Sequence, residues 1–203
     1  MTQITSGIRA VLSSPIVYSS FQRLMGAHSD RINYVQRYLK PAAGMFVLDV
    51  GCGPADILNY LPPVHYYGFD ISASYIQRAR LRFGDKGRFE QKQLTREDLL
   101  ALPKFDRVIA IGLLHHLDDE VAVDLMQMVR AVLAPGGKFV SLDPCLDVTQ
   151  NPIARFLVKN DRGRNVRDKD GYELLASKCF SHAHAEVRHK TWIPYTHCAM
   201  VCE

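Results

Sequence analysis

The stretch from Phe46 to Gly53 constrains the fold of this chain more than any other part of its sequence. Residues 46–50 read Phe-Val-Leu-Asp-Val, a run typical of a strand buried on both faces of a parallel sheet. Gly51 and Gly53 follow, and a residue without a Cβ lets the backbone turn tightly and come close to a ligand. A glycine turn between a buried strand and a helix is a nucleotide-binding device. The segment therefore predicts an α/β fold with a ligand site at the end of this strand.

Asp49 interrupts the apolar run, and a carboxylate in such a place costs free energy unless a donor pairs with it. The peptide N–H groups of the following turn are the obvious donors. We therefore expect Asp49 to brace the loop that contains the two glycines. Cys52 lies between them and is expected to fill space as a small apolar side chain rather than act as a nucleophile.

Apolar runs and helical patterns alternate along the chain, in the way that builds a parallel sheet with helices on both faces. A helical segment at 16–40, broken near Gly26, precedes the first strand. Ser72 is placed to cap one later helix, and Asp118 or Asp119 opens another. The predicted strands span 45–50, 66–69, 88–94, 105–111 and 138–142, with a helix at 55–61 and a turn at Pro135–Gly137.

Length and composition are those of one globular domain without a membrane span. The 203 residues suffice for a single α/β unit, and the apolar (47%) and charged (23%) fractions are ordinary for such a fold. No apolar run approaches the roughly 20 residues that cross a bilayer, and no signal-peptide pattern opens the chain. The net charge of +4 is too small to predict a nucleic-acid or membrane partner. Five scattered cysteines without a Cys-x-x-Cys pair favour reduced thiols and a cytoplasmic location.

The position of the next acidic residue indicates which nucleotide fits. Asp70 ends a predicted strand about 20 residues beyond the glycine turn, where a carboxylate accepts both hydroxyls of a ribose. A dinucleotide fingerprint needs a third glycine three residues after Gly53, but Asp56 occupies that place and would put a carboxylate near the pyrophosphate. The chain also has no Gly-x-x-x-x-Gly-Lys-Ser/Thr loop. The turn therefore favours an adenosine ligand without phosphates over NAD.

Four motifs follow one another along the chain, within a match from about Tyr34 to Asp143: Val47–Gly53, Phe69-Asp70, Phe105–Leu117 and Leu133–Val140. In this order they resemble the motifs of the class I S-adenosylmethionine-dependent methyltransferases, in the small-molecule branch called type 11 or type 12. The resemblance implies a Rossmann-like three-layer α/β sandwich whose seven-stranded, mostly parallel sheet has an antiparallel last strand. Residues 185–192 and 197–202 would supply the closing pair of strands. The resemblance also implies S-adenosyl-L-methionine as cofactor and S-adenosyl-L-homocysteine as product.

The resemblance further implies one methyltransferase domain that covers residues 1–203. The expected partner is a small-molecule acceptor, for a monomer or homodimer that binds neither nucleic acid nor membrane. The expected parts are an N-terminal helical cap (1–44), a cofactor-binding core (45–143), a substrate-side insert (145–171) and a closing helix and strands (172–203).

Each cofactor contact is carried over from the resemblance to one position of this sequence. The two glycines would let the methionine portion lie against the backbone, Asp70 would hold the ribose and Ile71 would pack on the adenine. The family often has an acid at the end of the third strand; here Gln93 stands there, and its carbonyl can accept the same bond from the adenine amine. Arg31 would pair with the carboxylate of the cofactor. The full expected set is Tyr18, Arg31, Asp49, Gly51, Cys52, Gly53, Asp70, Ile71, Gln93, Leu94, Ile111 and Gly112.

Methyl transfer asks mainly for placement, because near-attack geometry contributes roughly 7–11 kcal/mol and a sulfonium methyl is already activated. If a base takes part, His116 after the fourth strand is the first candidate and Asp143 after the fifth is the second. The insert at 145–171 is locally basic, so it is expected either to capture an anionic acceptor or to form a solvated, charge-balanced helix. The candidate substrate contacts are Arg162, Arg164, Arg167, Tyr195 and His197.

Three other functions remain open from the sequence alone. One is RNA or protein methylation, although the Asn/Asp-Pro-Pro-Tyr element of base amino-group methylation is absent. Another is a protein that binds S-adenosylmethionine without catalysis, and the third is an NAD-dependent oxidoreductase. No metal is expected: His182 and His184 are interpreted as structural, because no cysteine or acid lies nearby at ligand spacing. One of His115 and His116 is expected to pack or cap.

Overall fold

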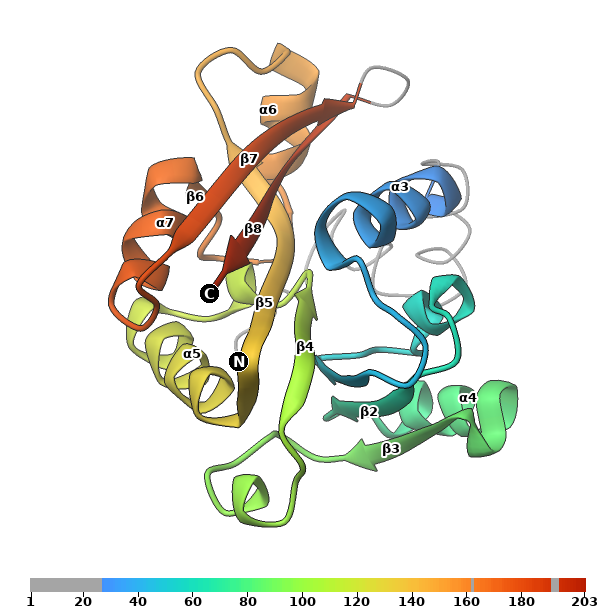
Figure 1. The fold of residues 1–203 in the computed structure, drawn as a ribbon. Coiled ribbons are helices and arrows are strands. Elements are labelled where there is room, and N and C mark those ends of the chain that lie inside the picture. The colour runs from blue at the N-terminus through green and yellow to red at the C-terminus, as the bar shows by residue number, and fades with distance from the viewer. Residues whose placement is uncertain (1–26, 162, 191–193) are drawn as a thin grey trace.

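The computed structural model describes residues 27–161, 163–190 and 194–203, and these form one sheet covered by helices (Figure 1). Along the sheet the strand order is β3-β2-β1-β4-β5-β8-β7, and a short strand, β6, pairs with β5 outside this path. The strands are β1 (Phe46–Val50), β2 (His65–Asp70), β3 (Gly87–Gln91), β4 (Phe105–Ile111), β5 (Leu133–Leu146), β6 (Arg167–Asp168), β7 (Ala183–Lys190) and β8 (Tyr195–Cys202).

Helices of three kinds connect these strands. The α-helices are α3 (Ala27–Tyr34), α4 (Ala73–Phe83), α5 (Asp119–Val132), α6 (Pro152–Lys159) and α7 (Lys169–Ser177). A π-helix, η1 (Val35–Leu39), continues α3. The 3₁₀ turns are η2 (Asp56–Tyr60), η3 (Gly84–Lys86), η4 (Asp98–Leu100) and η5 (Leu114–His116).

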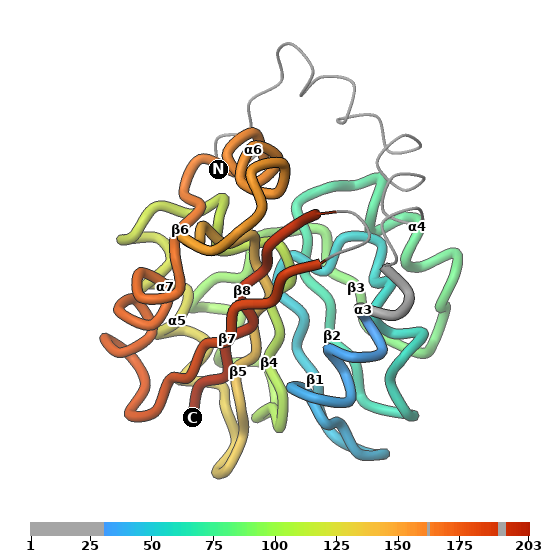
Figure 2. The backbone as a smooth tube through the Cα atoms, turned by 90° about the horizontal axis from the view of Figure 1, so that it is seen from above, coloured from blue at the N-terminus to red at the C-terminus, as the bar shows by residue number. Residues whose placement is uncertain are grey.

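The topology confirms the predicted fold class. Strands β1 to β5 pair in parallel, whereas β8 runs antiparallel to both β5 and β7. Figures 1 and 2 show α5 and α7 on one side of the molecule, with α3 and α4 on the other. The expected closing strands are present, as β7 and β8. Among the described residues, no helix combines the length and apolarity that crossing a bilayer requires.

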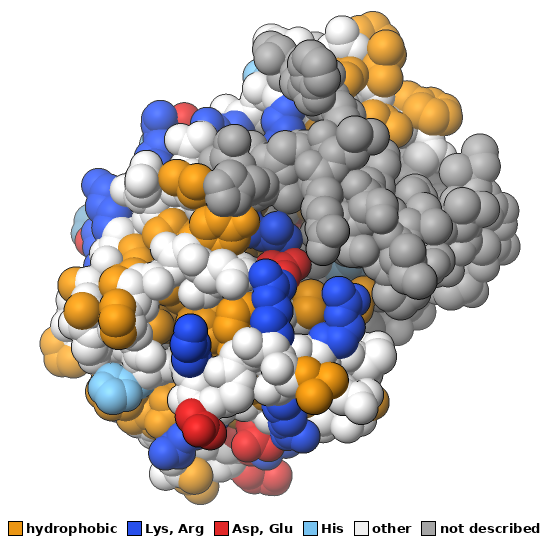
Figure 3. All heavy atoms as spheres, turned by 90° about the vertical axis from the view of Figure 1, so that its right-hand side faces the viewer, with side chains coloured by type: hydrophobic (Ala, Val, Ile, Leu, Met, Phe, Trp, Pro, Cys, Tyr) orange, Lys and Arg blue, Asp and Glu red, His pale blue; other side chains and the backbone are white. Residues whose placement is uncertain are grey.

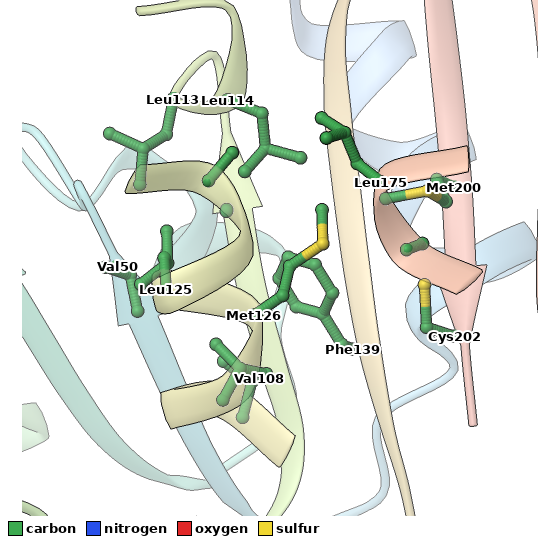
Figure 4. Packing of buried hydrophobic residues seen from close by; sticks show 14 of the residues in the cluster. Val50, Val108, Leu113, Leu114, Leu125, Met126, Phe139, Leu175, Met200 and Cys202 are labelled. Atoms are coloured by element: carbon green, nitrogen blue, oxygen red, sulfur yellow. The ribbon is translucent and has the colours of Figure 1, made fainter. Parts of the chain in front are cut away.

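Two hydrophobic clusters hold the helices against the sheet. Successive residues of a strand point to opposite faces, so Leu48 and Val50 join one cluster and Val47 joins the other. Figure 4 shows Met126 of α5 packed toward Phe139 of β5 in the first cluster, and both side chains are fully buried. Burying each such side chain contributes roughly 1.5–3 kcal/mol, so this contact fixes α5 on the sheet.

The predicted helix caps are confirmed. The Ser72 hydroxyl accepts a hydrogen bond from the Tyr75 N–H at 3.4 Å, and the Asp118 carboxylate accepts one from the Val121 N–H at 3.0 Å. Each cap satisfies a backbone donor that has no partner within the helix. Asn151 caps α6 in the same way, with Pro152 in the first turn, where its missing N–H costs nothing.

Three local predictions were wrong. The segment 55–61 forms the 3₁₀ turn η2 instead of an α-helix; it begins after Ala55, whose φ of 55° lies in the left-handed region. The third strand ends at Gln91 instead of residue 94. The segment Pro135–Gly137 does not reverse the chain, because β5 runs through it from Leu133 to Leu146.

The Pro-Gly-Gly segment instead produces an irregularity in the pairing of β4 with β5. The register shifts between Phe105 and Arg107, opposite this segment. Gly136 has a φ of 75°, and a Cβ on Gly137 would lie 2.7 Å from the carbonyl oxygen of Phe105. The glycines therefore accommodate a bulge, which a sequence pattern does not distinguish from a turn.

Candidate functional site

The glycine turn lies at the carboxyl end of β1, between β2 and β4. Its backbone is held by the end of β2: the N–H groups of Gly51 and Cys52 donate to the Phe69 carbonyl at 2.8 and 3.0 Å. The Gly53 N–H donates to Oδ2 of Asp70 at 2.9 Å. Gly51 and Gly53 have φ values of 73° and 54°, which favour glycine. The turn is therefore fixed by β2.

Asp49 does not brace this turn, and that prediction was wrong. Its Oδ2 accepts a hydrogen bond of 2.5 Å from the hydroxyl of Tyr66, on the neighbouring strand. Its Oδ1 has no hydrogen-bond partner among the described residues. Burial raises the pKa of Asp49 to about 7, the Tyr66 bond opposes this shift, and the charge of Asp70 adds to it. A buried acid with an unused oxygen therefore lies just before the turn.

Asp70 is positioned by backbone donors on both sides. Its Oδ2 accepts from Gly53, as above, and its Oδ1 accepts from the N–H of Ser72 at 2.8 Å. Each carboxylate oxygen has two lone pairs, so each can accept a further bond from a hydroxyl. The next residue, Ile71, is 54% exposed, and a Cβ on Gly53 would meet no atom within 4 Å. An open apolar surface thus lies beside a fixed carboxylate.

The residue that replaces the third glycine of a dinucleotide fingerprint is paired with arginine. Asp56 Oδ2 lies 3.3 Å from Nη2 of Arg31, and Oδ1 contacts Nη1 of Arg82. Arg31 of α3 is thereby brought beside the turn that precedes η2. Burial raises the pKa of the Cys52 thiol far beyond its ordinary value, which fits a space-filling role in the turn.

The other predicted cofactor residues lie at or beyond the ends of neighbouring strands. Half-buried Ile111 ends β4, and Gly112 follows with a φ of 66° and donates to the Leu142 carbonyl at 2.8 Å. Gln93 is exposed two residues beyond β3, whereas the side chain of Leu94 is 1% exposed and belongs to the core. Only the backbone of Leu94 is left for a ligand. Tyr18 lies outside the described residues.

A second cluster lies around His115, in the turn η5 that follows β4. His115 Nδ1 is 2.9 Å from Oδ1 of Asp143, and Nε2 is 3.1 Å from Oδ1 of Asp161. Burial disfavours the charge on His115, but the hydrogen bonds and charges of the two carboxylates outweigh it and raise its pKa to about 9. His115 is therefore an imidazolium at neutral pH, held between two carboxylates.

Two aromatic side chains at the start of β8 extend this cluster. The Tyr195 hydroxyl donates to Oδ2 of Asp161 at 2.6 Å, and the ring of His197 lies 4.8 Å from that of Tyr195. Burial lowers the pKa of His197 to about 3, and the charge of Lys190 adds to the effect, so His197 is neutral. The ring of His116 packs on that of His115, with centroids 4.0 Å apart.

Residues 163–167 pack against η5 and form hydrogen bonds with it. A Cβ on Gly163 would lie 2.0 Å from Cδ2 of His115, so the loop backbone packs directly on the imidazole. The Asn165 N–H donates to the His115 carbonyl at 3.0 Å. The guanidinium of Arg167 makes five hydrogen bonds, to the carbonyls of residues 114, 117 and 165 and twice to Asp119.

These bonds change the interpretation of the insert. A guanidinium has five N–H donors, and the bonds of Arg167 use all of them within the protein. The expectation that Arg167 contacts the acceptor was therefore wrong, because it holds η5 in place instead. Arg164 is exposed in the same loop, and Arg162 lies outside the described residues.

Comparison with known proteins shows a similarity to methyltransferases. Residues 48–139 match the family model described as a methyltransferase domain. The methyltransferase GfsG of Streptomyces halstedii is 28% identical over 188 residues, which cover 84% of this chain and 67% of that protein. The O-methyltransferase resE of Aspergillus sclerotiorum is 32% identical over 128 residues, 58% of this chain and 48% of that protein. Over this part of its length the chain is similar to the S-adenosylmethionine-dependent methyltransferases.

Solved structures share the fold of this chain. A putative O-methyltransferase from Nostoc punctiforme superposes with a TM-score of 0.68 at 16% identity, over 95% of this chain and 62% of that one. The DhpI–SAH complex gives a TM-score of 0.63 at 17% identity, over 91% of this chain and 88% of that one. The chain spans about half to two thirds of the length of the curated relatives above.

The structure brings the predicted site residues into two groups. The glycine turn, Asp70, Ile71 and Arg31 gather at the ends of β1 and β2, while His116, Asp143, Tyr195 and His197 gather around η5. Sequence reasoning missed Asp161 as a member of the second group and left open whether His115 merely packs. Within the described ranges, no three His, Cys, Asp or Glu side chains are arranged to hold a metal ion.

Proposed function

We propose that the protein transfers a methyl group from S-adenosylmethionine to a small-molecule acceptor. The observation that carries this proposal is the pairing of the Gly51–Gly53 turn with Asp70, which is fixed by two backbone N–H bonds beside the exposed Ile71. A sugar with two adjacent hydroxyls fits such a carboxylate, and a flat base fits the apolar side chain. The similarity of residues 48–139 to a methyltransferase domain supports the same ligand.

The residues at the ends of β1, β2 and β4 fit the methyl donor. Asp70 would hold the ribose hydroxyls, Ile71 would cover one face of the adenine, and Gln93 would accept from the adenine amine. The unused Oδ1 of buried Asp49 lies beside the turn and suits a cationic group. When bound, S-adenosylmethionine supplies a methyl group that its sulfonium already activates.

Arg31 would bind the carboxylate of the methyl donor, as the sequence predicts. This arginine already contacts Asp56 at 3.3 Å, so its guanidinium has been brought to the turn before any ligand arrives. Ile111, Gly112 and the backbone at residue 94 would complete the wall of the site. The turn therefore needs little rearrangement to bind its ligand, which lowers the entropic cost of binding.

The acceptor would lie against the second cluster. We assign proton transfer, where the acceptor needs it, to His116 rather than to Asp143. Asp143 is 1% exposed, and its Oδ1 accepts both from the His115 backbone and from its ring. Asp143 is therefore closed to solvent and held by His115, whereas the side chain of His116 is half-buried in the same turn. Tyr195 and His197 would line the same side.

An exposed arginine in the insert supports an anionic acceptor. Arg164 is the described arginine of this loop that remains exposed, and it fits an anionic group on the acceptor. The predicted O, N or C acceptor atom, the monomeric or homodimeric state and the cytoplasmic location stay predictions. We propose no RNA or protein methylation.

Calorimetry with three ligands tests the methyl-donor assignment. We expect S-adenosylmethionine and S-adenosylhomocysteine to bind with micromolar or lower Kd and NAD to show no heat of binding. Binding of NAD with the same affinity would contradict the assignment.

A transfer assay tests the assignment of His116. Tritiated S-adenosylmethionine is incubated with fractions of a metabolite extract, and His116→Ala is compared with His182→Ala as an exposed control. We expect His116→Ala to lower turnover by at least 10²-fold at neutral pH while binding S-adenosylhomocysteine normally. Unchanged turnover at every pH would remove the proton-transfer role of His116.

A further inference from the structure

The helix α6 exposes apolar side chains that a surface helix normally buries. Its sequence, Pro-Ile-Ala-Arg-Phe-Leu-Val-Lys, contains two basic residues, no acid and otherwise only apolar residues. Ala154 and Val158 are buried where α6 packs on β5 and β8. On the outside, Ile153 is 60% exposed and Phe156 is 64% exposed. The helix is therefore apolar on its inner and its outer face.

The outward apolar residues form one patch. Ile153 and Phe156 are three positions apart, so they are neighbours on the helix surface. Val148, in the loop before the helix, is 92% exposed. In Figure 3 hydrophobic side chains gather at the top of the molecule, where Figure 1 places α6. We call Ile153 and Phe156 the α6 patch; neighbouring exposed apolar residues of this kind mark interaction sites.

Basic side chains border the α6 patch, and the two acids near it form hydrogen bonds within the protein. Arg155 and Lys159 are exposed on the same helix, and Arg164 is exposed in the following loop. Asp161 is bound by His115 and Tyr195, and Asp147 accepts from the Thr149 N–H at 2.8 Å. Asp161 pairs with the His115 imidazolium, and the exposed basic residues outnumber the remaining carboxylate of Asp147, so the surface around the patch is apolar with an excess of positive charge.

We propose that α6 docks on the surface of a lipid bilayer that contains anionic headgroups. Apolar side chains of an interfacial helix enter the boundary between headgroups and acyl chains, while its Lys and Arg residues contact the phosphates. Docking of this kind needs no spanning helix, and it replaces the sequence-based expectation that no membrane takes part. Since α6 leads from β5 to Asp161, docking would place the His115 cluster close to the lipid surface.

Vesicle sedimentation tests this proposal on the full chain. The protein is mixed with vesicles of phosphatidylcholine alone or with 30% phosphatidylglycerol (roughly physiological surface charge), at low and at high salt. We expect binding to the anionic vesicles that weakens as salt is added. No binding to them, or equal binding to both compositions, would overturn the proposal.

Two pairs of variants separate the apolar and the charged contributions. Ile153→Ser/Phe156→Ser removes the apolar contact, and we expect at least a tenfold loss of partitioning. The control Leu81→Ser/Leu174→Ser changes two apolar residues that are as exposed (81% and 64%) on other helices, and it should bind as the parent does. Equal losses in both variants would contradict a role for the α6 patch.

Arg155→Gln/Lys159→Gln should weaken partitioning about fivefold for each charge removed. The matched control, Arg78→Gln/Lys86→Gln, removes two exposed charges elsewhere and is expected to cost less than twofold. Sedimentation velocity without lipid completes the test. A dimer that dissociates in the Ile153→Ser/Phe156→Ser variant would show that a second copy covers the patch, and would overturn the proposal.

Discussion

Replacing Asp161 by asparagine should remove a pH-dependent part of the stability between pH 7 and 9. The pKa of His115 is about 9 in the folded chain and 6.5 ordinarily, so folded His115 binds more protons than the unfolded chain in this range. Stability from this group is therefore complete below pH 6.5 and is lost as the pH rises through 9. By linkage, protonation of His115 contributes about 2.5 kcal/mol to the free energy of unfolding at pH 7 and about 0.5 kcal/mol at pH 9.

The variant also leaves His115 with one carboxylate instead of two. Breaking a buried ion pair costs roughly 3–5 kcal/mol, and because the Asp161 side chain is 24% exposed, we expect about 2–3 kcal/mol at pH 7. Asp124→Asn is the control, since its pair with Arg96 is exposed on both sides and is expected to contribute less than about 1 kcal/mol at any pH.

Urea denaturation at pH 6, 7, 8 and 9 measures both effects. The wild type and Asp124→Asn should lose about 2 kcal/mol between pH 7 and 9, whereas Asp161→Asn should lose less than about 1 kcal/mol. The same decline in Asp161→Asn as in the wild type would refute the assignment of His115 as a buried imidazolium between two acids.

Two further substitutions test the hydrogen bonds that hold Asp49, before the glycine turn, and η5, which carries His115. Tyr66→Phe deletes the 2.5 Å hydrogen bond to Asp49 and should lower the free energy of unfolding by about 1–3 kcal/mol. Because that bond favours the charged form of Asp49, the loss measured by urea denaturation should be larger at pH 8 than at pH 5. Arg167→Lys cannot reproduce five hydrogen bonds and should lower the free energy of unfolding by about 2–4 kcal/mol, while Arg164→Lys, in the same loop, should leave it within about 0.5 kcal/mol.

The sequence predicts the sheet well because its signals are local and agree with one another. β4 has the predicted bounds, and the caps at Ser72 and Asp118 lie where side-chain chemistry places them. The motif spacing also puts Asp70 at the end of β2, beside the turn at Gly53. Each of these features depends on residues that are close in the chain or on strands that pair in parallel.

The parts that sequence reasoning missed depend on long-range contacts. His115 and Asp143 are 28 residues apart, and Asp161 and Tyr195 are 34 apart, so no spacing rule pairs them. Asp49 accepts a hydrogen bond from Tyr66 on the neighbouring strand β2 instead of from the adjacent turn, because β1 and β2 pair side by side. Arg167 was expected to face a ligand, but only the folded backbone of η5 reveals the carbonyls that it binds.

The affinity of Asp70 variants for S-adenosylhomocysteine tests the central claim most directly. Calorimetry should give a Kd raised about 10²-fold or more for Asp70→Ala, because two hydrogen bonds to a charged acceptor contribute roughly 1.5–3 kcal/mol each. Asp85→Ala, at an exposed position beyond α4, should bind as the wild type does. If a folded Asp70→Ala protein kept the wild-type Kd, the carboxylate would not hold the ribose, and the proposed site would be contradicted.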